Sequence, residues 1–131
     1  MKTQGATQKR LVFDHRHLDV STLCKADVPN VAYATGHGAL IAGDCIEVLP
    51  TFRDESFDTI FADPPFNLGK TYRDKTNDRR GKAEYVAWCR KWLGECTRVL
   101  KQGGSLFVYN LPKWNVLLGV FLAEQGLDFR H

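Results

Sequence analysis

The feature that most constrains the fold of this chain is a strand, helix, strand pattern in its second half. Residues 57–63 read as a short buried strand with the sequence FDTIFAD. From residue 82 to residue 100, apolar side chains recur at steps of three and four, which predicts an amphipathic helix. Two glycines follow, as expected after a helix, and residues 105–109 predict a second strand. This alternation is typical of a parallel sheet with crossover helices, so the expected fold class is α/β.

The segments on either side extend the same pattern. Residues 39–43 predict another strand, and residues 47–52 predict a short helix or turn. Pro112 marks the start of a further helix, which Gly126 ends. Residues 127–131 then predict one more extended segment, inside which the chain stops. The expected sheet is therefore mostly parallel and flanked by helices.

The first part of the chain carries a weaker signal. Residues 1–38 are polar or weakly patterned, so we assign them to an N-terminal extension and residues 39–131 to one partial domain. His15 and His17 flank Arg16, and alternating histidines can bind a metal ion. No nearby set of Cys, Asp or Glu completes such a site. A surface strand or loop is the favoured interpretation, and we predict no metal site.

Composition limits the class of protein. The 131 residues suffice for one globular domain, 44% of them are apolar, and no stretch approaches the roughly 18 apolar residues of a membrane span. The net charge of +3 and the pI of about 8.7 are compatible with nucleic-acid binding without being diagnostic of it. The four cysteines form no Cys-x-x-Cys pair, and Cys89 and Cys96 share one helix face. Buried, reduced thiols and a cytoplasmic location are therefore expected.

A second constraint lies at the end of the strand at residues 57–63. Asp63-Pro64-Pro65-Phe66 would stand at the carboxyl end of that strand, where ligands bind in open α/β sheets. The two prolines lack N–H groups, so their turn is rigid and its carbonyls are free to accept hydrogen bonds. With the carboxylate of Asp63 and the flat ring of Phe66, they could grip the exocyclic amine of a nucleobase. The alternative is a structural turn in which Asp63 caps a local segment.

The motif resembles the catalytic motif of site-specific DNA amino-methyltransferases, the adenine-N6 and cytosine-N4 DNA methylase family. These enzymes transfer a methyl group from S-adenosylmethionine to an exocyclic nitrogen of adenine or cytosine in DNA. The segments 43–45, 48–50, 57–58 and 92–108 are also similar to that family. The resemblance covers residues 39–131 and implies a Rossmann-like methyltransferase fold, of which this chain carries the N-terminal part.

The resemblance also implies roles for single residues. The carboxylate of Asp63 and the carbonyl of Pro64 would accept the target amine, and the ring of Phe66 would hold the flipped base by stacking. The residues expected to be catalytic are Asp63, Pro64, Pro65 and Phe66. The cofactor S-adenosylmethionine would be bound by Asp44, Cys45 and Asp63. For Asp44, an ordinary turn is the equally weighted alternative.

One part of such a site is missing from the sequence. The family also needs a glycine-rich turn of the type Phe-x-Gly-x-Gly, which lets the backbone approach the methionine part of the cofactor. Gly36-His37-Gly38 is a weak candidate, because it precedes a predicted strand instead of following one. We therefore expect an incomplete domain without its C-terminal half: a fragment, a truncated reading frame or half of a split enzyme. The missing half or a homodimer partner would complete the site.

The loop at residues 67–81 follows the motif directly and carries five basic against two acidic residues. A flexible basic loop at the mouth of the pocket could contact the phosphates of double-stranded DNA and fold over a flipped base. The alternative is a solvated connector. The residues predicted to bind nucleic acid are Lys70, Tyr72, Arg73, Lys75, Arg79 and Arg80.

The predicted function is methyl transfer from S-adenosylmethionine to the exocyclic amine of a DNA base. Asp in the first motif position favours N6 of adenine over N4 of cytosine. One alternative is a catalytically inactive truncated fragment or one half of a split enzyme. Another is an amino-methyltransferase of RNA or of protein glutamine, which shares a Pro-Pro-aromatic motif, usually with Asn first.

Overall fold

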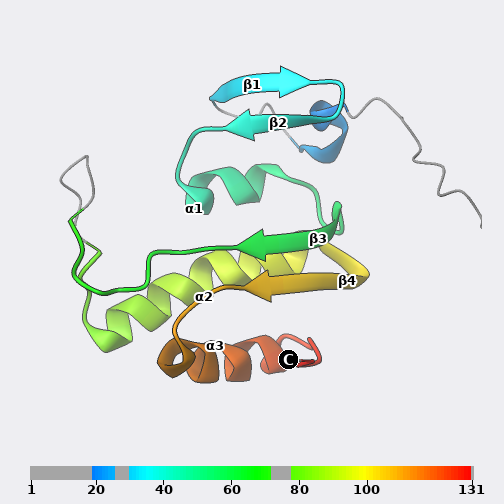
Figure 1. Ribbon diagram of the computed structural model, residues 1–131. Helices are drawn as coiled ribbons and strands as arrows, with labels where there is room; N and C mark the ends of the chain where they lie inside the picture. Colours follow the sequence, from blue (N-terminus) through cyan, green and yellow to red (C-terminus); the bar gives the residue numbers. More distant parts are fainter. Residues whose placement is uncertain (1–18, 26–29, 72–77, 131) are drawn as a thin grey trace, which may run out of the picture.

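The computed structural model describes residues 19–25, 30–71 and 78–130. These residues form an antiparallel hairpin, a parallel strand pair, two long helices and three short helical turns (Figure 1). No helix in the described ranges is long and apolar enough to cross a membrane. In chain order the elements are η1 (Val20–Leu23), β1 (Val31–Thr35), β2 (Gly38–Ile41), α1 (Cys45–Val48), η2 (Leu49–Thr51), β3 (Phe57–Ala62), α2 (Lys82–Val99), β4 (Leu100–Val108) and α3 (Pro112–Glu124).

The predicted strand, helix, strand pattern is confirmed by β3, α2 and β4. The two strands pair in parallel, with Phe61 opposite Phe107, and α2 runs behind them (Figure 1). Cys89 and Cys96 are buried free thiols, as predicted. One face of α2 is buried at steps of three and four residues, and its buried side chains are Tyr85, Cys89, Trp92, Leu93, Cys96 and Val99.

Only one face of the β3–β4 pair is covered. Ile60 and Leu106 pack against the apolar cluster formed by α2 and α3. On the opposite face, Phe61 is 71% exposed and Phe107 is 55% exposed. The prediction of a fully buried strand at residues 57–63 is therefore wrong for one face, because no element in the described ranges packs against it.

The boundary between α2 and β4 also differs from the prediction. The helix ends directly before Leu100, so the two glycines lie inside β4 instead of between helix and strand. Phe57 pairs with Leu100, but Thr59 pairs with Ser105, so β4 bulges between these two pairs. Gly103 has a φ of 76°, a conformation that glycine adopts without strain, and it allows the bulge to form.

The predicted strand at residues 39–43 is β2, but it does not join the parallel pair. It pairs with β1 in an antiparallel hairpin through a two-residue turn at Gly36 and His37. Membership of β2 in a parallel sheet is therefore a wrong prediction. All five residues of β1 are exposed, so no apolar stripe in the sequence indicated this partner strand. The expected boundary between residues 38 and 39 falls inside β2.

The predicted helix from Pro112 to Gly126 is confirmed as α3. Pro112 lies in its first turn, and the N–H of Leu127 donates to the carbonyl of Leu122 at 3.1 Å beyond its end. Gly126 has a φ of 88°, as this type of helix end requires. The segment predicted to be extended after it forms no strand at residues 127–130, which pair with no strand of the described chain, and residue 131 lies outside the described residues.

The ends of the strands indicate where a site can form. Figure 1 shows that β2, β3 and β4 all point to the same side of the molecule. The short helix or turn predicted at residues 47–52 is confirmed by α1 and η2, and α1 begins on this side. Asp44, which follows β2, and Asp63, which follows β3, are therefore both at this edge.

Candidate active site

The motif begins directly after β3, as predicted. Asp63 and Pro65 are exposed, whereas Pro64 and Phe66 are half-buried. The N–H of Tyr109 donates to the carbonyl of Ala62 at 2.9 Å, so the backbone pairing of the two strands continues up to the motif. The motif therefore starts from a fixed position at the strand edge.

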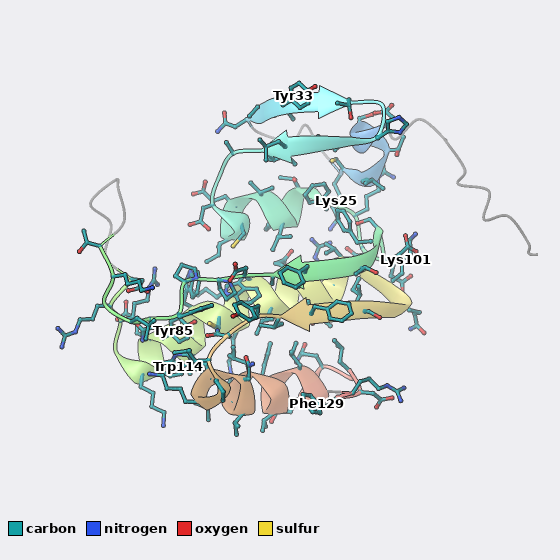
Figure 2. All side chains as sticks on the ribbon, in the orientation of Figure 1. Lys25, Tyr33, Tyr85, Lys101, Trp114 and Phe129 are labelled. Carbon is teal, nitrogen blue, oxygen red and sulfur yellow. The ribbon has the colours of Figure 1, made fainter. Side chains whose placement is uncertain are left out.

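Two buried aromatic side chains hold the backbone of the motif. The hydroxyl of Tyr85, from α2, donates to the carbonyl of Pro65 at 2.7 Å. The indole Nε1 of Trp114, from α3, donates to the carbonyl of Phe66 at 3.0 Å. The two rings pack on each other with centroids 4.6 Å apart, and Figure 2 shows them next to one another. Both long helices thus contribute one donor to the motif.

Asn110 fixes the direction of the Tyr85 hydroxyl. Its Nδ2 donates to the Tyr85 oxygen at 2.9 Å, and its Oδ1 accepts the N–H of Leu111 at 2.8 Å. Burial raises the pKa of Tyr85 far above its ordinary value, so the phenol keeps its proton at neutral pH. A phenol has one hydrogen, and here that hydrogen points to the carbonyl of Pro65.

The structure leaves two acceptors of the motif available. In the described part of the chain, neither the carboxylate of Asp63 nor the carbonyl of Pro64 takes part in a recorded hydrogen bond or ion pair. These are the two groups that the sequence predicted to receive an amine. The ring of Phe66, two residues after Pro64, meets the ring of Tyr109 edge-on, with centroids 5.5 Å apart.

Asp44 has a structural role in this site. Its carboxylate caps α1 by accepting the N–H of Ile46 at 2.9 Å, which corresponds to the ordinary-turn alternative. A carboxylate has two oxygens, so the cap leaves one of them for a further donor. Cys45 is exposed beside it, and partial burial together with the charge of Asp44 raises the pKa of its thiol. Binding of a cofactor by these residues stays a prediction.

The two ends of the basic loop are joined by hydrogen bonds into a base, which the sequence did not predict. The buried carboxylate of Asp78 accepts the N–H of Leu68 at 3.1 Å and that of Lys70 at 2.7 Å. The side chain of Asn67 forms two hydrogen bonds with the backbone of Arg80, at 3.0 and 2.6 Å. The two ends of the loop are therefore joined next to the motif.

Only part of the predicted nucleic-acid surface can be placed. Lys70, Arg79 and Arg80 are exposed near this base, and the guanidinium of Arg80 lies 4.9 Å from the ring centre of Trp88. Tyr72, Arg73 and Lys75 lie outside the described residues, as do His15 and His17. In the described ranges, no group of three or more His, Cys, Asp or Glu side chains could hold a metal ion.

Comparison with known proteins identifies the family of the chain. Residues 57–130, more than half of the chain, match the family described as DNA methylase. The chain belongs to the DNA methylase family. The resemblance to DNA amino-methyltransferases is thereby confirmed. The match includes the motif, the loop at residues 67–81, and the two aromatic anchors of the motif, Tyr85 and Trp114. Asp44 lies outside it.

Several relatives in this family are named methyltransferases. The type II methyltransferase M.BamHI of Bacillus amyloliquefaciens is 50% identical over 99 residues, which are 76% of this chain and 23% of that protein. M.HinfI of Haemophilus influenzae is 39% identical over 106 residues, or 69% of this chain and 28% of the relative. The DNA adenine methyltransferase YhdJ of Escherichia coli (strain K12) is 38% identical over 71 residues, or 54% of this chain and 24% of the relative. The chain thus spans about a quarter of the length of these DNA methylases.

Proposed function

We propose that the complete protein transfers a methyl group from S-adenosylmethionine to the exocyclic amine of a DNA base, with N6 of adenine as the target. The observation that carries this proposal is the arrangement of the motif: within the described residues, the carboxylate of Asp63 and the carbonyl of Pro64 have no hydrogen-bond donor, and the aromatic Phe66 follows in the same turn. Adenine is favoured by Asp63 in the first position and by the relative named a DNA adenine methyltransferase.

The two acceptors suit the chemistry of an exocyclic amine. The nitrogen lone pair of such an amine is delocalised into the ring, so the nitrogen is a poor nucleophile. Hydrogen bonds from its two hydrogens to Asp63 and to the Pro64 carbonyl favour tetrahedral nitrogen and stabilise the positive charge that develops there. A hydrogen bond to a charged acceptor contributes about 1.5–3 kcal/mol, or roughly one to two decades in rate.

The base must leave the duplex to reach these acceptors. The ring of Phe66 would then hold it by stacking, an interaction of about 1–3 kcal/mol per base. Lys70, Arg79 and Arg80 stand at the base of the loop that follows, where they would contact DNA phosphates. Tyr72, Arg73 and Lys75 are proposed for the same surface on the basis of the sequence.

The residues present fit part of S-adenosylmethionine, which would supply the electrophilic methyl group. Asp44 has one carboxylate oxygen that the α1 cap does not use, and it follows β2 on the side of the molecule to which β3 leads. Asp44, Cys45 and Asp63 would bind the cofactor from this edge. The sequence holds no Phe-x-Gly-x-Gly turn for the methionine part, so a further polypeptide segment has to provide it.

The proposal is tested with the complete product of the gene and with radiolabelled S-adenosylmethionine. Duplex DNA, an RNA of the same sequence and a glutamine-containing peptide are offered separately. Label in DNA, recovered as N6-methyladenine after hydrolysis, is the expected result. Label only in RNA or in the peptide would replace the DNA assignment by one of the alternatives, and label in none would identify an inactive remnant.

A further inference from the structure

We propose that Tyr85 and Trp114 are positioning residues that orient the Pro64 carbonyl of the motif to receive the target amine. This inference rests on the proposed function. The motif contains four backbone carbonyls, those of Asp63, Pro64, Pro65 and Phe66. In the described part of the chain, the last two have donors from the helices and the first two have none.

The anchors act as obligatory donors. The indole Nε1 of Trp114 can only donate, and its partner is the carbonyl of Phe66. The Tyr85 hydroxyl receives the Nδ2 of Asn110 on its oxygen, so its single hydrogen has to go to the carbonyl of Pro65. The carbonyls of Pro65 and Phe66 are thereby held by the two helices, and this orients the neighbouring Pro64 carbonyl for the substrate.

Burial makes this arrangement rigid. Tyr85 is 1% exposed and Trp114 is 6% exposed, and both belong to the main apolar cluster. A phenylalanine at position 85 would fill the same space and keep the packing with Trp114. The hydroxyl therefore adds no packing that the core requires, and its effect on the motif can be separated from its effect on stability.

The first test compares three variants of the complete gene product. Tyr85→Phe removes the donor to Pro65. Tyr33→Phe removes an exposed hydroxyl from β1 and serves as the control for loss of a phenol oxygen. Val99 is buried in a separate apolar cluster with Cys24 and Phe52, so Val99→Ala lowers the melting temperature without touching the motif. Single-turnover methyl transfer is measured for each, together with the Kd for DNA and for S-adenosylmethionine.

The expected result is a rate lowered by about tenfold to a hundredfold in Tyr85→Phe, because a small misplacement of the acceptor is costly in the chemical step. Both Kd values should stay within about twofold. Tyr33→Phe and Val99→Ala should keep the parent rate. A Tyr85→Phe rate no lower than that of Val99→Ala would show that Tyr85 is only a core residue and would overturn the inference.

Asn110→Asp gives a second, sharper variant in case Tyr85→Phe folds poorly. The aspartate keeps the acceptor for the Leu111 N–H but removes the donor to Tyr85, so the phenol hydrogen turns to the new carboxylate and leaves Pro65. The rate should fall as in Tyr85→Phe, and the double variant should be no slower than the slower single variant. Additive losses would contradict the shared hydrogen-bond chain. Failure of the parent to methylate DNA would instead refute the proposed function and this inference with it.

Discussion

At the scale of single residues, the candidate site is shaped by side chains that lie far from it in the chain. Tyr85 and Trp114 are 20 and 48 positions away from the residues whose carbonyls they bind. The carboxylate of Asp63, by contrast, forms no hydrogen bond or ion pair in the described ranges. The site thus combines a backbone that is held firmly with a carboxylate that is left for a ligand, which is the combination that preorganised stabilisation of a developing charge requires.

The aromatic residue of the motif should matter for both binding and transfer. Phe66→Ala is expected to weaken DNA binding and to lower the single-turnover rate, because stacking holds the flipped base before and during transfer. A loss of about 1–3 kcal/mol corresponds to roughly fivefold to a hundredfold in affinity. Phe66→Tyr keeps the ring face and should behave as the parent. If Phe66→Ala bound DNA as tightly as the parent, the stacking role would be contradicted.

The basic residues at the loop base should act on affinity alone. Replacing Arg79 and Arg80 together by Gln should weaken DNA binding and lower the slope of log Kd against log salt by about one to two, as loss of one or two phosphate contacts requires. The saturating single-turnover rate should not change. Lys101→Gln is the control, because Lys101 pairs with Asp58 and Figure 2 shows it at the other end of the strands from Tyr85. An unchanged salt slope in the double variant would show that Arg79 and Arg80 do not contact the phosphates of the bound DNA.

At the scale of elements, local sequence signals predicted most of the structure but not the pairings between elements. The periodic apolar residues of α2, the proline that starts α3 and the glycine that ends it are all local features. The bulge at Gly103 depends on pairing with β3, and β1 is exposed along its length. The tie of Asp78 to Leu68 and Lys70 could not be predicted either, because an Asp within a basic loop reads as a solvated charge.

Alanine should change the free energy of unfolding in opposite directions at two glycines, Gly104 in the β4 bulge and Gly119 in α3. A Cβ at Gly104 would lie 2.9 Å from the carbonyl oxygen of Asp58, so Gly104→Ala should destabilise the chain by about 1–3 kcal/mol. A Cβ at Gly119, within α3, meets nothing within 4 Å, and Gly119→Ala should stabilise by about 0.5–1 kcal/mol through helix propensity. Urea unfolding measures both. A neutral Gly104→Ala would contradict the close approach of the two strands.

At the scale of the whole molecule, the described residues leave one face and the edges of the β3–β4 pair uncovered. Phe61 and Phe107 stand opposite each other on the uncovered face of the β3–β4 pair. The strand edge carries the motif, whereas the glycine-rich turn expected for the cofactor is not in the sequence. The sequence predicted the motif because its residues are contiguous. It did not predict the anchors, because a Tyr or Trp on an apolar helix face reads as core whether or not its polar atom has a partner.

The proposed cofactor site leads to a prediction for the 131-residue chain by itself. Asp44 and Cys45 would offer contacts to one part of S-adenosylmethionine only, so titration calorimetry should detect weak binding or none. Sinefungin, a cofactor analogue with the same adenosine part and the same α-amino acid end, should behave alike. Micromolar binding of either compound to the isolated chain would show that the cofactor site has been misplaced.

The most direct test of the central claim concerns the carboxylate of Asp63 in the complete gene product. Asp63→Ala and Asp58→Ala remove carboxylates from the two ends of the same strand, and only the first stands at the motif. Single-turnover methyl transfer should fall by about a hundredfold or more in Asp63→Ala, since the carboxylate acts mainly on the transition state, while the Kd for DNA stays within about twofold. Asp58→Ala should keep the parent rate. A near-normal single-turnover rate in Asp63→Ala would contradict the account, whatever the change in binding.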